Sequence, residues 1–476
     1  MDFKKRINKI EIAERTIYTL ATIVFALNRY SYLMRFLTIV FTLLTFSTFS
    51  QQSLNVQLLD HWDGEWVDTN NTGVKYNEVW GFVNKGQEYA VIGSVNGAHI
   101  FSISNEGKLT EVDFVPGNFQ GHVVHRDYHD LDGYLYAVSD QGPSTLQIID
   151  LSFLPDSVHI VYDSDSLINT AHNIFIDPSS KLLYACGPAG DPGMSVFSIA
   201  NPIEPVLLYD YLFFYVHDVY VRNDSAYLNC GNDGFWVYDF STPSAPINLG
   251  SLTSYPDQGY NHSGWLSEDG KTYILADETR GKKLKVLDVS DLSDINIHSL
   301  FGTEWWDETL PHNLMFFDGI AYVSYYNDGL QIFDIRDVNN PKQIGYFDSY
   351  LENNDKIFQG VWGVYAQLPS GKLLFSDRST GLYIVGFTIP PDINNGGHGI
   401  YPNPANDQAW FYQAHSTNNP YSLQLFSSEG KLIDEIVGQT DHLQLDLSKY
   451  NAGVYLYRYI NETTNVINVG KFLRLK

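Results

Sequence analysis

Seven ring-bearing residues recur along the chain at nearly constant intervals, and their side chains are the ones best suited to chemistry. They are Trp80, His125, His172, His217, His262, His312 and Trp362, separated by 45 to 50 residues. Imidazole nitrogens and carboxylate oxygens are common ligands of divalent transition metals. The nearest acidic candidates are Asp140, Asp277 and Asp377. If the fold brings these side chains together, they form a metal or ligand site.

Each ring-bearing residue stands at the start of the first of four short apolar runs. The stretch from Pro311 to Asp348 shows the pattern most clearly, with runs at 314–317, 321–325, 330–335 and 343–347. Asp318-Gly319 separates the first two runs, and this pair supplies the positive φ values that a tight hairpin turn needs. The stretch therefore predicts a four-stranded antiparallel meander. Such a meander cannot bury both of its apolar faces alone, so the chain has to repeat it.

Seven copies of this unit can be aligned between residues 53 and 389. Their third runs read IFSIS at 100, IIDLS at 148, VFSIA at 196, VYDFS at 237, VLDVS at 286, IFDIR at 332 and IVGFT at 384. A period in the forties with four strands in each unit is typical of a β-propeller. The predicted fold class is all-β, with a seven-bladed β-propeller at residues 53–389 and a small β-sandwich after it.

The two ends of this array predict how the circle closes. The seventh copy ends without a fourth strand, whereas residues 56–62, VQLLDHW, form a strand with no partner of their own. Pairing them with residues 382–387 would complete the last blade and remove an exposed edge. In a propeller the first strand of each blade lines the central channel. The seven ring-bearing residues should then meet at one mouth of that channel.

The sequence leaves two interpretations of this ring open. Two of the seven residues are Trp, and an indole N–H cannot bind a metal, whereas all seven are flat rings that carry a hydrogen-bond donor. We therefore expect a structural contact between neighbouring blades, and no cofactor. A divalent metal or another ligand in the channel is the alternative, and with it a metal-dependent hydrolase of the lactonase type.

The repeat region resembles a known family of bacterial propellers. The motifs that carry the resemblance are TAHNIFID at 170, VHDVYVRND at 216, GFWVYDFS at 234, ADETRG at 276, LPHNLMF at 310, VSYYNDGLQIFDI at 323 and VWGVYAQLPSGKLLFSDRSTGLYIVG at 361. They are similar to the LVIVD-repeat, choice-of-anchor B family over residues 54–389. The resemblance implies a secreted or cell-surface protein. It brings no established catalytic residues with it.

Trp305 and Trp306 predict a second possible binding surface. They lie with acidic neighbours in the long connection between the fifth and sixth copies, where propeller loops reach the face of the disc. Strand alternation cannot bury two adjacent indoles, so at least one of them should cover the channel mouth or contact a ligand such as a sugar ring. The alternative is a loop that packs against its own blade.

The charge of the chain excludes several partners. The formal net charge is -26, which repels nucleic acid and anionic lipid. Arg280, Lys282, Lys283 and Lys285 form the densest basic cluster, which is too small for a nucleic-acid track and is interpreted as a solvated turn. The sequence also lacks the short motifs of serine hydrolases, P-loop proteins and zinc peptidases. No nucleic-acid partner is expected, and an enzyme is less expected than a binding protein.

Two cysteines, Cys186 and Cys230, fall at similar phases of neighbouring repeats. We expect buried free thiols, and a bridge between them is the alternative.

The first fifty residues predict export. Met34-Arg35 precedes the apolar run FLTIVFTLLTFSTFS, which ends in small residues before Gln51, and this is the pattern of a secretory signal peptide. Residues 1–50 are therefore interpreted as an N-terminal extension with a signal peptide that starts at Met34. The apolar run is too short for a membrane anchor, so no transmembrane helix is expected in the mature chain.

The last part of the chain has a different pattern. Residues 390–399 read as a Gly/Asn-rich linker, and residues 400–476 resemble the type IX secretion sorting domain. The matching residues are Tyr401, Pro402, Asn403, Pro404, Gly430, Lys431, Gly453, Val454 and Tyr455. Alternating apolar residues with Gly-Lys and Ala-Gly turns predict a small β-sandwich. The resemblance implies export by the type IX secretion machinery.

Together these patterns predict an exported propeller, secreted or attached to the outside of the bacterial outer membrane. We expect it to act as a binding or adhesion scaffold for an extracellular glycan or protein. A purely structural surface component is a further possibility. The sequence identifies neither the ligand nor the oligomeric state.

Overall fold

The computed structural model describes residues 53–64, 67, 69, 73–190, 192–303, 308–350, 358–388, 398–401, 405, 408–413, 421–428, 430–438, 442–461 and 467–474. All regular elements within these ranges are β-strands, and the ranges contain no helix long and apolar enough to cross a membrane. The predicted signal peptide, the linker residues 390–397, and Trp305 and Trp306 lie outside the described residues.

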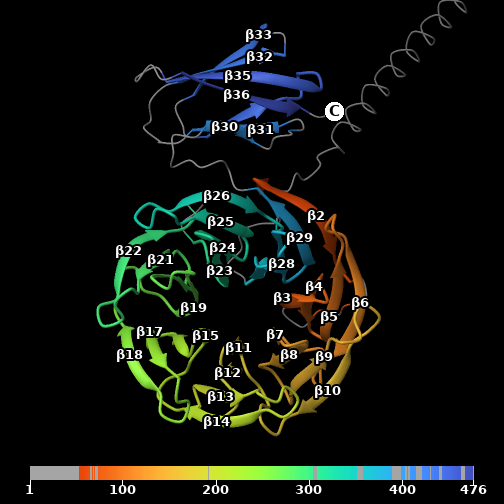
Figure 1. The fold of residues 1–476 in the computed structure, drawn as a ribbon, viewed down its shortest axis with the longest axis vertical. Helices are drawn as coiled ribbons and strands as arrows, with labels where there is room; N and C mark the ends of the chain where they lie inside the picture. Colours follow the sequence, from red (N-terminus) through yellow and green to blue (C-terminus); the bar gives the residue numbers. More distant parts are fainter. Residues whose placement is uncertain are drawn as a thin grey trace, which may run out of the picture. The chain divides into compact units, whose positions relative to one another are not determined.

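Residues 53–388, as far as they are described, form seven antiparallel sheets arranged in a circle around one axis (Figure 1). Blade 1 contains β3 (Tyr76–Asn84), β4 (Gln87–Ser94), β5 (Gly97–Ile103) and β6 (Leu109–Pro116). Blade 2 contains β7 (Arg126–Leu131), β8 (Tyr134–Ser139), β9 (Leu146–Asp150) and β10 (His159–Ser164). Blade 3 contains β11 (Asn173–Asp177), β12 (Leu182–Cys186), β13 (Met194–Ser198) and β14 (Val206–Tyr211).

The remaining blades repeat this order. Blade 4 contains β15 (Asp218–Arg222), β16 (Ser225–Asn229), β17 (Phe235–Asp239) and β18 (Ile247–Leu252). Blade 5 contains β19 (Asn261–Leu266), β20 (Thr272–Asp277), β21 (Leu284–Asp288) and β22 (Asn296–Phe301). Blade 6 contains β23 (Leu314–Phe317), β24 (Ile320–Ser324), β25 (Leu330–Asp334) and β26 (Lys342–Phe347). Blade 7 contains β27 (Val361–Tyr365), β28 (Lys372–Asp377) and β29 (Gly381–Phe387). The predicted seven-bladed propeller is confirmed.

Local backbone geometry explains the shape of each blade. Asp318 and Gly319, between β23 and β24, have φ values of 51° and 72°, as the predicted two-residue hairpin turn requires. In each of the seven described blades the third and fourth strands shift register at one point. Such a bulge increases the twist of the outer strand. Each sheet therefore twists between its inner strand and its outer edge.

The N-terminal segment closes the circle. β2 (Val56–Trp62) pairs with β29 from Val56 opposite Phe387 to Trp62 opposite Leu382, so the predicted closure is confirmed. β1 (Ser53–Leu54) was not predicted, and it pairs with β26 of blade 6. Asn55, with a φ of 57°, turns the chain between the two sheets. One short segment therefore covers the outer edges of two neighbouring blades.

The basic cluster at residues 280–285 was predicted to be a solvated turn, and this prediction is wrong for Lys285. Lys285 is fully buried, and its Nζ lies 2.7 Å from Asp277 Oδ2 and donates to the carbonyl of Asp257. Lys285 lies within β21, paired with Leu275 of β20, and not in the turn before that strand. The two cysteines are buried and free, as expected.

The described residues from 398 onward form two sheets that pack around a separate core. One contains β30 (His398–Tyr401), β31 (Gln408–Gln413) and β34 (His442–Asp446). The other contains β33 (Leu432–Gly438), β32 (Tyr421–Ser427), β35 (Gly453–Asn461) and β36 (Ile467–Arg474). Phe411, Leu445, Leu423 and Phe472 are buried in one cluster between them, which is the predicted β-sandwich.

The predicted sorting residues lie at its strand ends. Gly430 and Lys431 lie between β32 and β33, where Gly430 has a φ of 81°. Gly453, Val454 and Tyr455 begin β35, and Tyr455 is buried. Tyr401 ends β30, whereas Pro402, Asn403 and Pro404 lie outside the described residues.

Candidate functional site

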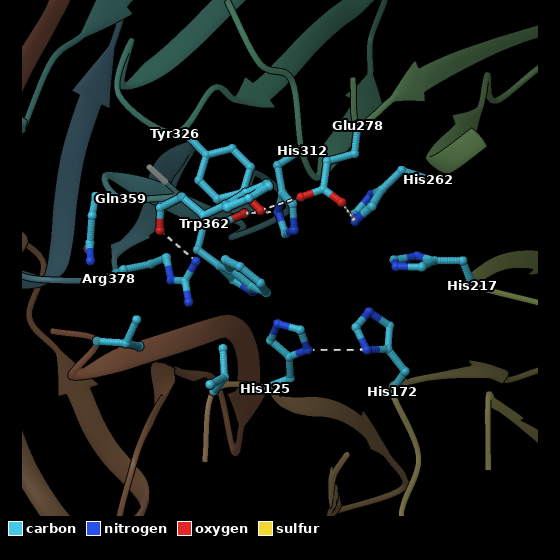
Figure 2. A pocket seen from close by; sticks show the side chains of 13 residues that line it. His125, His172, His217, His262, Glu278, His312, Tyr326, Gln359, Trp362 and Arg378 are labelled. Atoms are coloured by element: carbon cyan, nitrogen blue, oxygen red, sulfur yellow. Dashed lines mark hydrogen bonds and ion pairs between the residues drawn. The ribbon is translucent and has the colours of Figure 1, made fainter. Parts of the chain in front are cut away.

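Six of the predicted ring-bearing residues form a closed ring at one mouth of the propeller channel (Figure 2). Each stands at or just before the start of the first strand of its blade. The centroids of neighbouring rings are 4.1 to 4.7 Å apart around the whole circle. The members are His125, His172, His217, His262, His312 and Trp362. Their backbone positions repeat from blade to blade, which explains why the sequence spacing reveals them.

Trp80 does not lie in this ring, which corrects its predicted place. Its indole N–H donates to Asp130 Oδ1 over 2.8 Å, and its ring centroid lies 4.3 Å from that of His129, deeper in the channel. Trp80 is the fifth residue of β3, as Tyr365 is of β27, whereas the ring members stand at or just before the start of their strands. Trp80 therefore corresponds to the deeper aromatic residues of the other blades, which ring type and spacing alone cannot distinguish from the ring position. Blade 1 contributes Val74 to the mouth instead.

The ring surrounds a cavity of about 550 Å³. Besides the five imidazoles and Trp362, it is lined by Val74, Val124, Glu278, Tyr326, Phe358, Gln359 and Arg378. Glu278 and Arg378 directly follow the second strands of blades 5 and 7, and Asp140 follows that of blade 2 in the same way, while Tyr326 comes two residues after that of blade 6. The residue after the second strand is therefore a second recurrent position at the mouth.

Two of the three predicted acidic candidates lie away from the cavity, which corrects their expected role. Asp277 and Asp377 are the last residues of β20 and β28, one position before the lining residue. Successive side chains of a strand point to opposite faces, so both are buried beside it. Asp277 contacts Lys285, and Asp377 accepts a hydrogen bond from Ser349. Glu278 and Arg378, which come one residue later, line the cavity and were not predicted.

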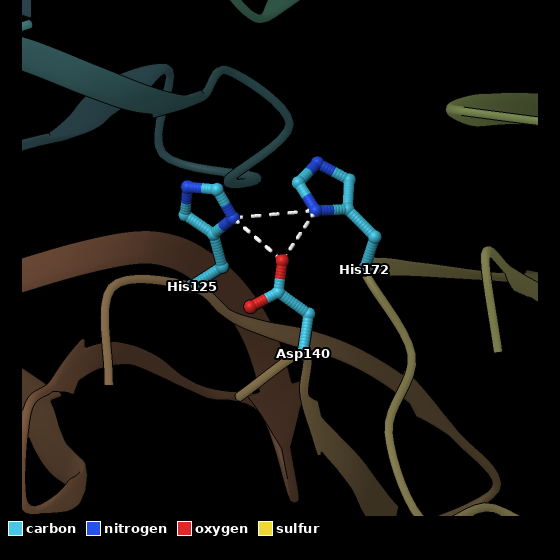
Figure 3. Close-up of side chains that lie close together, drawn as sticks. All are labelled: His125, Asp140 and His172. Atoms are coloured by element: carbon cyan, nitrogen blue, oxygen red, sulfur yellow. Dashed lines mark hydrogen bonds and ion pairs between the residues drawn. The ribbon is translucent and has the colours of Figure 1, made fainter. Parts of the chain in front are cut away.

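Asp140 joins two imidazoles from neighbouring blades (Figure 3). Its Oδ2 lies 2.9 Å from His125 Nδ1 and 2.8 Å from His172 Nδ1. Burial alone would raise the pKa of Asp140, but the hydrogen bonds from the two imidazoles lower it to about 2. Asp140 is therefore ionised at neutral pH. With Nδ1–H of each imidazole donated to it, Nε2 remains the acceptor atom of both rings.

A second cluster joins His217, His262 and Glu278. His262 Nε2 lies 3.7 Å from Glu278 Oε2, and one potential ligand atom of each of the three residues lies within 4.8 Å of the others. Tyr326 donates its hydroxyl to the other carboxylate oxygen, Oε1, over 2.5 Å. Burial raises the pKa of Glu278, and the hydrogen bond from Tyr326 opposes this shift. His217 Nδ1 is buried and has no hydrogen-bond partner among the described residues.

Burial also decides the charge of the imidazoles. It lowers the pKa of His125, with the hydrogen bond to Asp140 opposing the shift. It lowers the pKa values of His217, His262 and His312 well below the usual range, and neighbouring imidazoles add to the effect. At neutral pH these four side chains are neutral, and neutral imidazole is the form that binds metals and accepts hydrogen bonds.

Arg378 supplies a positive charge to the same cavity. Its guanidinium carbon lies 4.5 Å from the ring centroid of Trp362, and Nη1 donates to the carbonyl of Phe358 over 2.6 Å. Trp362 also accepts, through its backbone carbonyl, a hydrogen bond of 2.7 Å from His312 Nδ1. These contacts hold Trp362 as part of the wall, with His125 on one side and His312 on the other.

Below the ring, the channel becomes narrow and acidic. A cavity of about 20 Å³ is lined by Glu78, Asp127 and Asp218 together with Asn173 and Asn313. Burial raises the pKa values of Asp127 and Asp218 to about 7, and raises that of Glu78 well above its usual range. The carboxylates also repel one another. This layer separates the mouth from the deeper part of the channel.

The deepest layer is aromatic. Neighbouring rings there have centroids 4.3 to 5.2 Å apart. The rings belong to Trp80, His129, Phe175, Tyr220, Trp265 and Tyr365. Where a blade contributes both to the ring at the mouth and to this deepest layer, the deep residue comes three or four positions after the mouth residue in the sequence. Burial lowers the pKa of His129 to about 4, so this layer carries no positive charge at neutral pH.

Comparison with known proteins identifies the C-terminal part. Residues 399–471 match the family described as secretion system C-terminal sorting domain. This is the domain that directs proteins to the type IX secretion system, as its sequence motifs indicated. The chain therefore uses that machinery and is secreted or attached to the cell surface. No curated protein matches the sequence.

Solved structures show the fold of the larger part. A protein from Lactobacillus plantarum has a TM-score of 0.50 at 13% identity, covering 78% of this chain and all of that chain. PorZ, a surface component of the type IX secretion system of Porphyromonas gingivalis, has a TM-score of 0.45 at 11% identity and covers 87% of this chain. The β-propeller domain of Cps50 (Swd1) from Myceliophteria thermophila has a TM-score of 0.48. This chain spans 61% of the length of the PorZ chain. At such identities the likeness shows the fold alone.

The fold and the sorting domain together define a class of protein. It is an exported, surface-targeted β-propeller with a C-terminal type IX secretion sorting domain. Within this class, the ring of five imidazoles at the channel mouth is the feature that requires a functional explanation.

Proposed function

We propose that this exported propeller is a binding scaffold that holds an extracellular ligand in the cavity at its channel mouth. The observation that supports this most directly is the cavity itself, whose wall combines side chains from all seven blades. Its volume, about 550 Å³, lies in the usual range for small-molecule sites, and its polar groups converge on one space. A ring that served only to join blades would not need to enclose a cavity of this size.

The chemistry of the wall favours the end of a glycan chain as the ligand. Neutral imidazoles offer both donors and acceptors, Glu278 offers an acceptor, and Arg378 offers several donors. These groups suit the hydroxyls of a sugar ring. Phe358, 51% exposed, adds an open aromatic face to the wall. Sugar rings commonly pack their C–H groups against such a face.

The connection between β14 and β15 extends the apolar rim. Leu212 and Phe213 are 65% and 67% exposed, and the ring centroid of Tyr215 lies 6.1 Å from that of His217. Exposed apolar side chains beside a pocket are typical of an interaction surface. A glycan chain that entered the cavity would have this rim available for its next sugar units.

A glycan-array screen with the full chain tests this proposal, followed by calorimetric titration of the best glycan. We expect Phe358→Ala to weaken binding at least tenfold. Phe317→Ala is the matched control because Phe317 is 43% exposed but lies at the far end of β23, five residues after His312. An array without any hit, or equal losses in the two variants, contradicts the proposal. A protein ligand found instead would also replace it.

A metal-dependent hydrolase is the second candidate. The observation that favours it is the approach of His217, His262 and Glu278 from separate strands to one space. A metal held there with an open position would activate water. Assays of lactones, esters and phosphoesters with added Zn²⁺ or Mn²⁺ test this candidate, and absence of turnover in the whole panel rejects it.

We also propose two finer assignments. The propeller belongs to the LVIVD-repeat, choice-of-anchor B family, a proposal supported by the motifs quoted above, such as VHDVYVRND at 216. Residues 34–50 act as a signal peptide, which is consistent with a C-terminal secretion sorting domain. N-terminal sequencing of the exported protein tests the second assignment, because the mature chain should begin near Gln51.

A further inference from the structure

We propose that His217, His262 and Glu278 bind one divalent transition-metal ion of the zinc type at the channel mouth. This goes beyond the proposed glycan site, because the ion can bind whether or not a glycan does. Two imidazole nitrogens and one carboxylate oxygen are a donor set that zinc prefers in proteins. The three residues come from blades 4 and 5: His217 precedes β15, His262 lies in β19 and Glu278 follows β20.

The spacing of the atoms is that of ligands and not of hydrogen-bonded partners. His262 Nε2 and Glu278 Oε2 are 3.7 Å apart, beyond the usual length of a hydrogen bond. Two ligands of one tetrahedral zinc ion, with bonds of about 2.1 Å, lie roughly 3.4 Å apart. The ring centroid of His217 lies 4.2 Å from that of His262. Small side-chain rotations would bring all three ligand atoms into place.

His217 provides an independent reason to expect a ligand. Its side chain is more than nine-tenths buried, with 8% of the residue exposed, and its Nδ1 has no hydrogen-bond partner within the described part of the chain. A buried polar atom without a partner costs about 1–3 kcal/mol. In Figure 2 the imidazole of His217 points into the cavity between His172 and His262. One ring nitrogen of His217 belongs to the triad, and a metal ion there would give this imidazole a polar partner.

The other triad, His125, Asp140 and His172, is already joined by hydrogen bonds. Asp140 Oδ2 accepts from both Nδ1 atoms at 2.9 and 2.8 Å. Asp140 Oδ1 is buried without a hydrogen-bond partner among the described residues, but both imidazoles of this triad have one. The two triads are therefore not equivalent, although each combines two imidazoles with one carboxylate.

Tyr326 gives Glu278 a defined orientation for this role. Its hydroxyl donates to Oε1, which leaves Oε2 directed at His262. Hydrogen bonds of this kind to a ligating carboxylate are common around metal sites, and their loss typically lowers metal affinity 10- to 100-fold. Tyr326 would thus be a positioning residue. The three ligands would leave a fourth position open towards the cavity, where water or a glycan oxygen can bind.

Metal titration of the tag-free full chain tests the inference. We expect one Zn²⁺ or Co²⁺ per chain by elemental analysis, with the visible absorption of tetrahedral Co²⁺. His217→Ala and Glu278→Gln should each weaken binding at least 100-fold, and Tyr326→Phe about tenfold. The matched control is His298→Ala, because His298 Nε2 lies 3.6 Å from Asp288 Oδ2 in a similar pair outside the cavity. Its affinity for the metal should equal that of the unchanged protein.

Several outcomes would overturn the assignment. One is the absence of stoichiometric metal in the unchanged protein, and another is undiminished binding in Glu278→Gln with native-like circular dichroism. A 100-fold loss in Asp140→Asn together with normal binding in His217→Ala would move the ion to the other triad. If His217→Ala does not fold, Glu278→Gln and Tyr326→Phe decide the question. A glycan-array result does not enter this decision, so the two proposals can fail separately.

Discussion

The mouth of the channel and its deepest layer are lined by the same first strands, yet their side chains differ in kind. At the mouth, five imidazoles and Trp362 surround an open cavity and contact groups that carry charge. Further along the strands, six aromatic rings contact one another around the deepest part of the channel. The comparison suggests that stability comes from the deep layer. The mouth is then free to keep side chains that packing alone would not select.

The largest expected effect is in the deep layer. Trp265 packs against three separate hydrophobic clusters, between blades 4, 5 and 6 and across the channel. Trp265→Ala should lower the free energy of unfolding by about 3–5 kcal/mol because it leaves a large cavity. Equilibrium unfolding in urea measures this. His217→Ala at the mouth should change the same quantity by about 1 kcal/mol or less. Similar losses in both variants would remove the distinction between the layers.

The acidic layer between them should make stability depend on pH. Burial raises the pKa of Asp127 to about 7, so the folded protein holds this proton more tightly than the unfolded chain does. The free energy of unfolding should therefore fall as the pH rises from about 4 to about 7, by on the order of 2–4 kcal/mol. Urea unfolding at a series of pH values measures the change.

Asp127→Asn provides the control for this prediction. Asn keeps an oxygen that can accept the 2.6 Å hydrogen bond from the backbone N–H of Ile174, but it has no proton to lose. Its stability should depend less on pH over this interval. Parallel profiles for the two proteins would show that Asp127 is not the group responsible.

The sequence was sufficient for the repeating parts of the structure. Asp318-Gly319 predicts the turn between β23 and β24, and residues 56–62 predict the closing strand, because turn chemistry and edge pairing are local rules. The repeat also predicts that five imidazoles occupy equivalent positions in their blades and meet at the channel mouth. The sequence was not sufficient for the place of Trp80. This indole is the fifth residue of β3 and belongs to the deep layer, but its ring and its spacing resemble those of the residues at the mouth.

The candidate site was predicted only in part for a related reason. Glu278 and Arg378 lie one residue beyond the second strands, whereas the predicted residues, Asp277 and Asp377, are at the strand ends. One residue along a strand reverses the direction of the side chain, so the exact strand end decides which of two adjacent side chains lines the cavity. The buried pair of Lys285 and Asp277 shows the same limit. A sequence pattern places a charge on a turn or a strand only to within about one residue.

A smaller effect is expected at the mouth from Asp140. Its pKa is held at about 2, below its usual value near 3.8, so its ionised form stabilises the fold above about pH 4, and that stability is lost as the pH falls towards 2. Asp140→Asn should lower the free energy of unfolding at pH 7 by about 1–3 kcal/mol. It should also reduce the loss of stability between pH 4 and pH 2. Asp156→Asn, at an exposed position of blade 2, should have neither effect, and an equal effect there would contradict the role of Asp140.

The smallest effect on stability is expected from Tyr326→Phe, which removes only the hydroxyl that donates to Glu278. We expect a loss of about 0.5–1.5 kcal/mol, the usual net contribution of one hydrogen bond. Tyr184→Phe is the matched control, because Tyr184 is fully buried in blade 3 and its hydroxyl has no partner among the described residues. Removing that hydroxyl should leave stability unchanged or raise it slightly. If Tyr326→Phe lowered the free energy of unfolding as much as Trp265→Ala, the mouth would stabilise the fold as strongly as the deep layer does. Its imidazoles would then need no ligand to explain them.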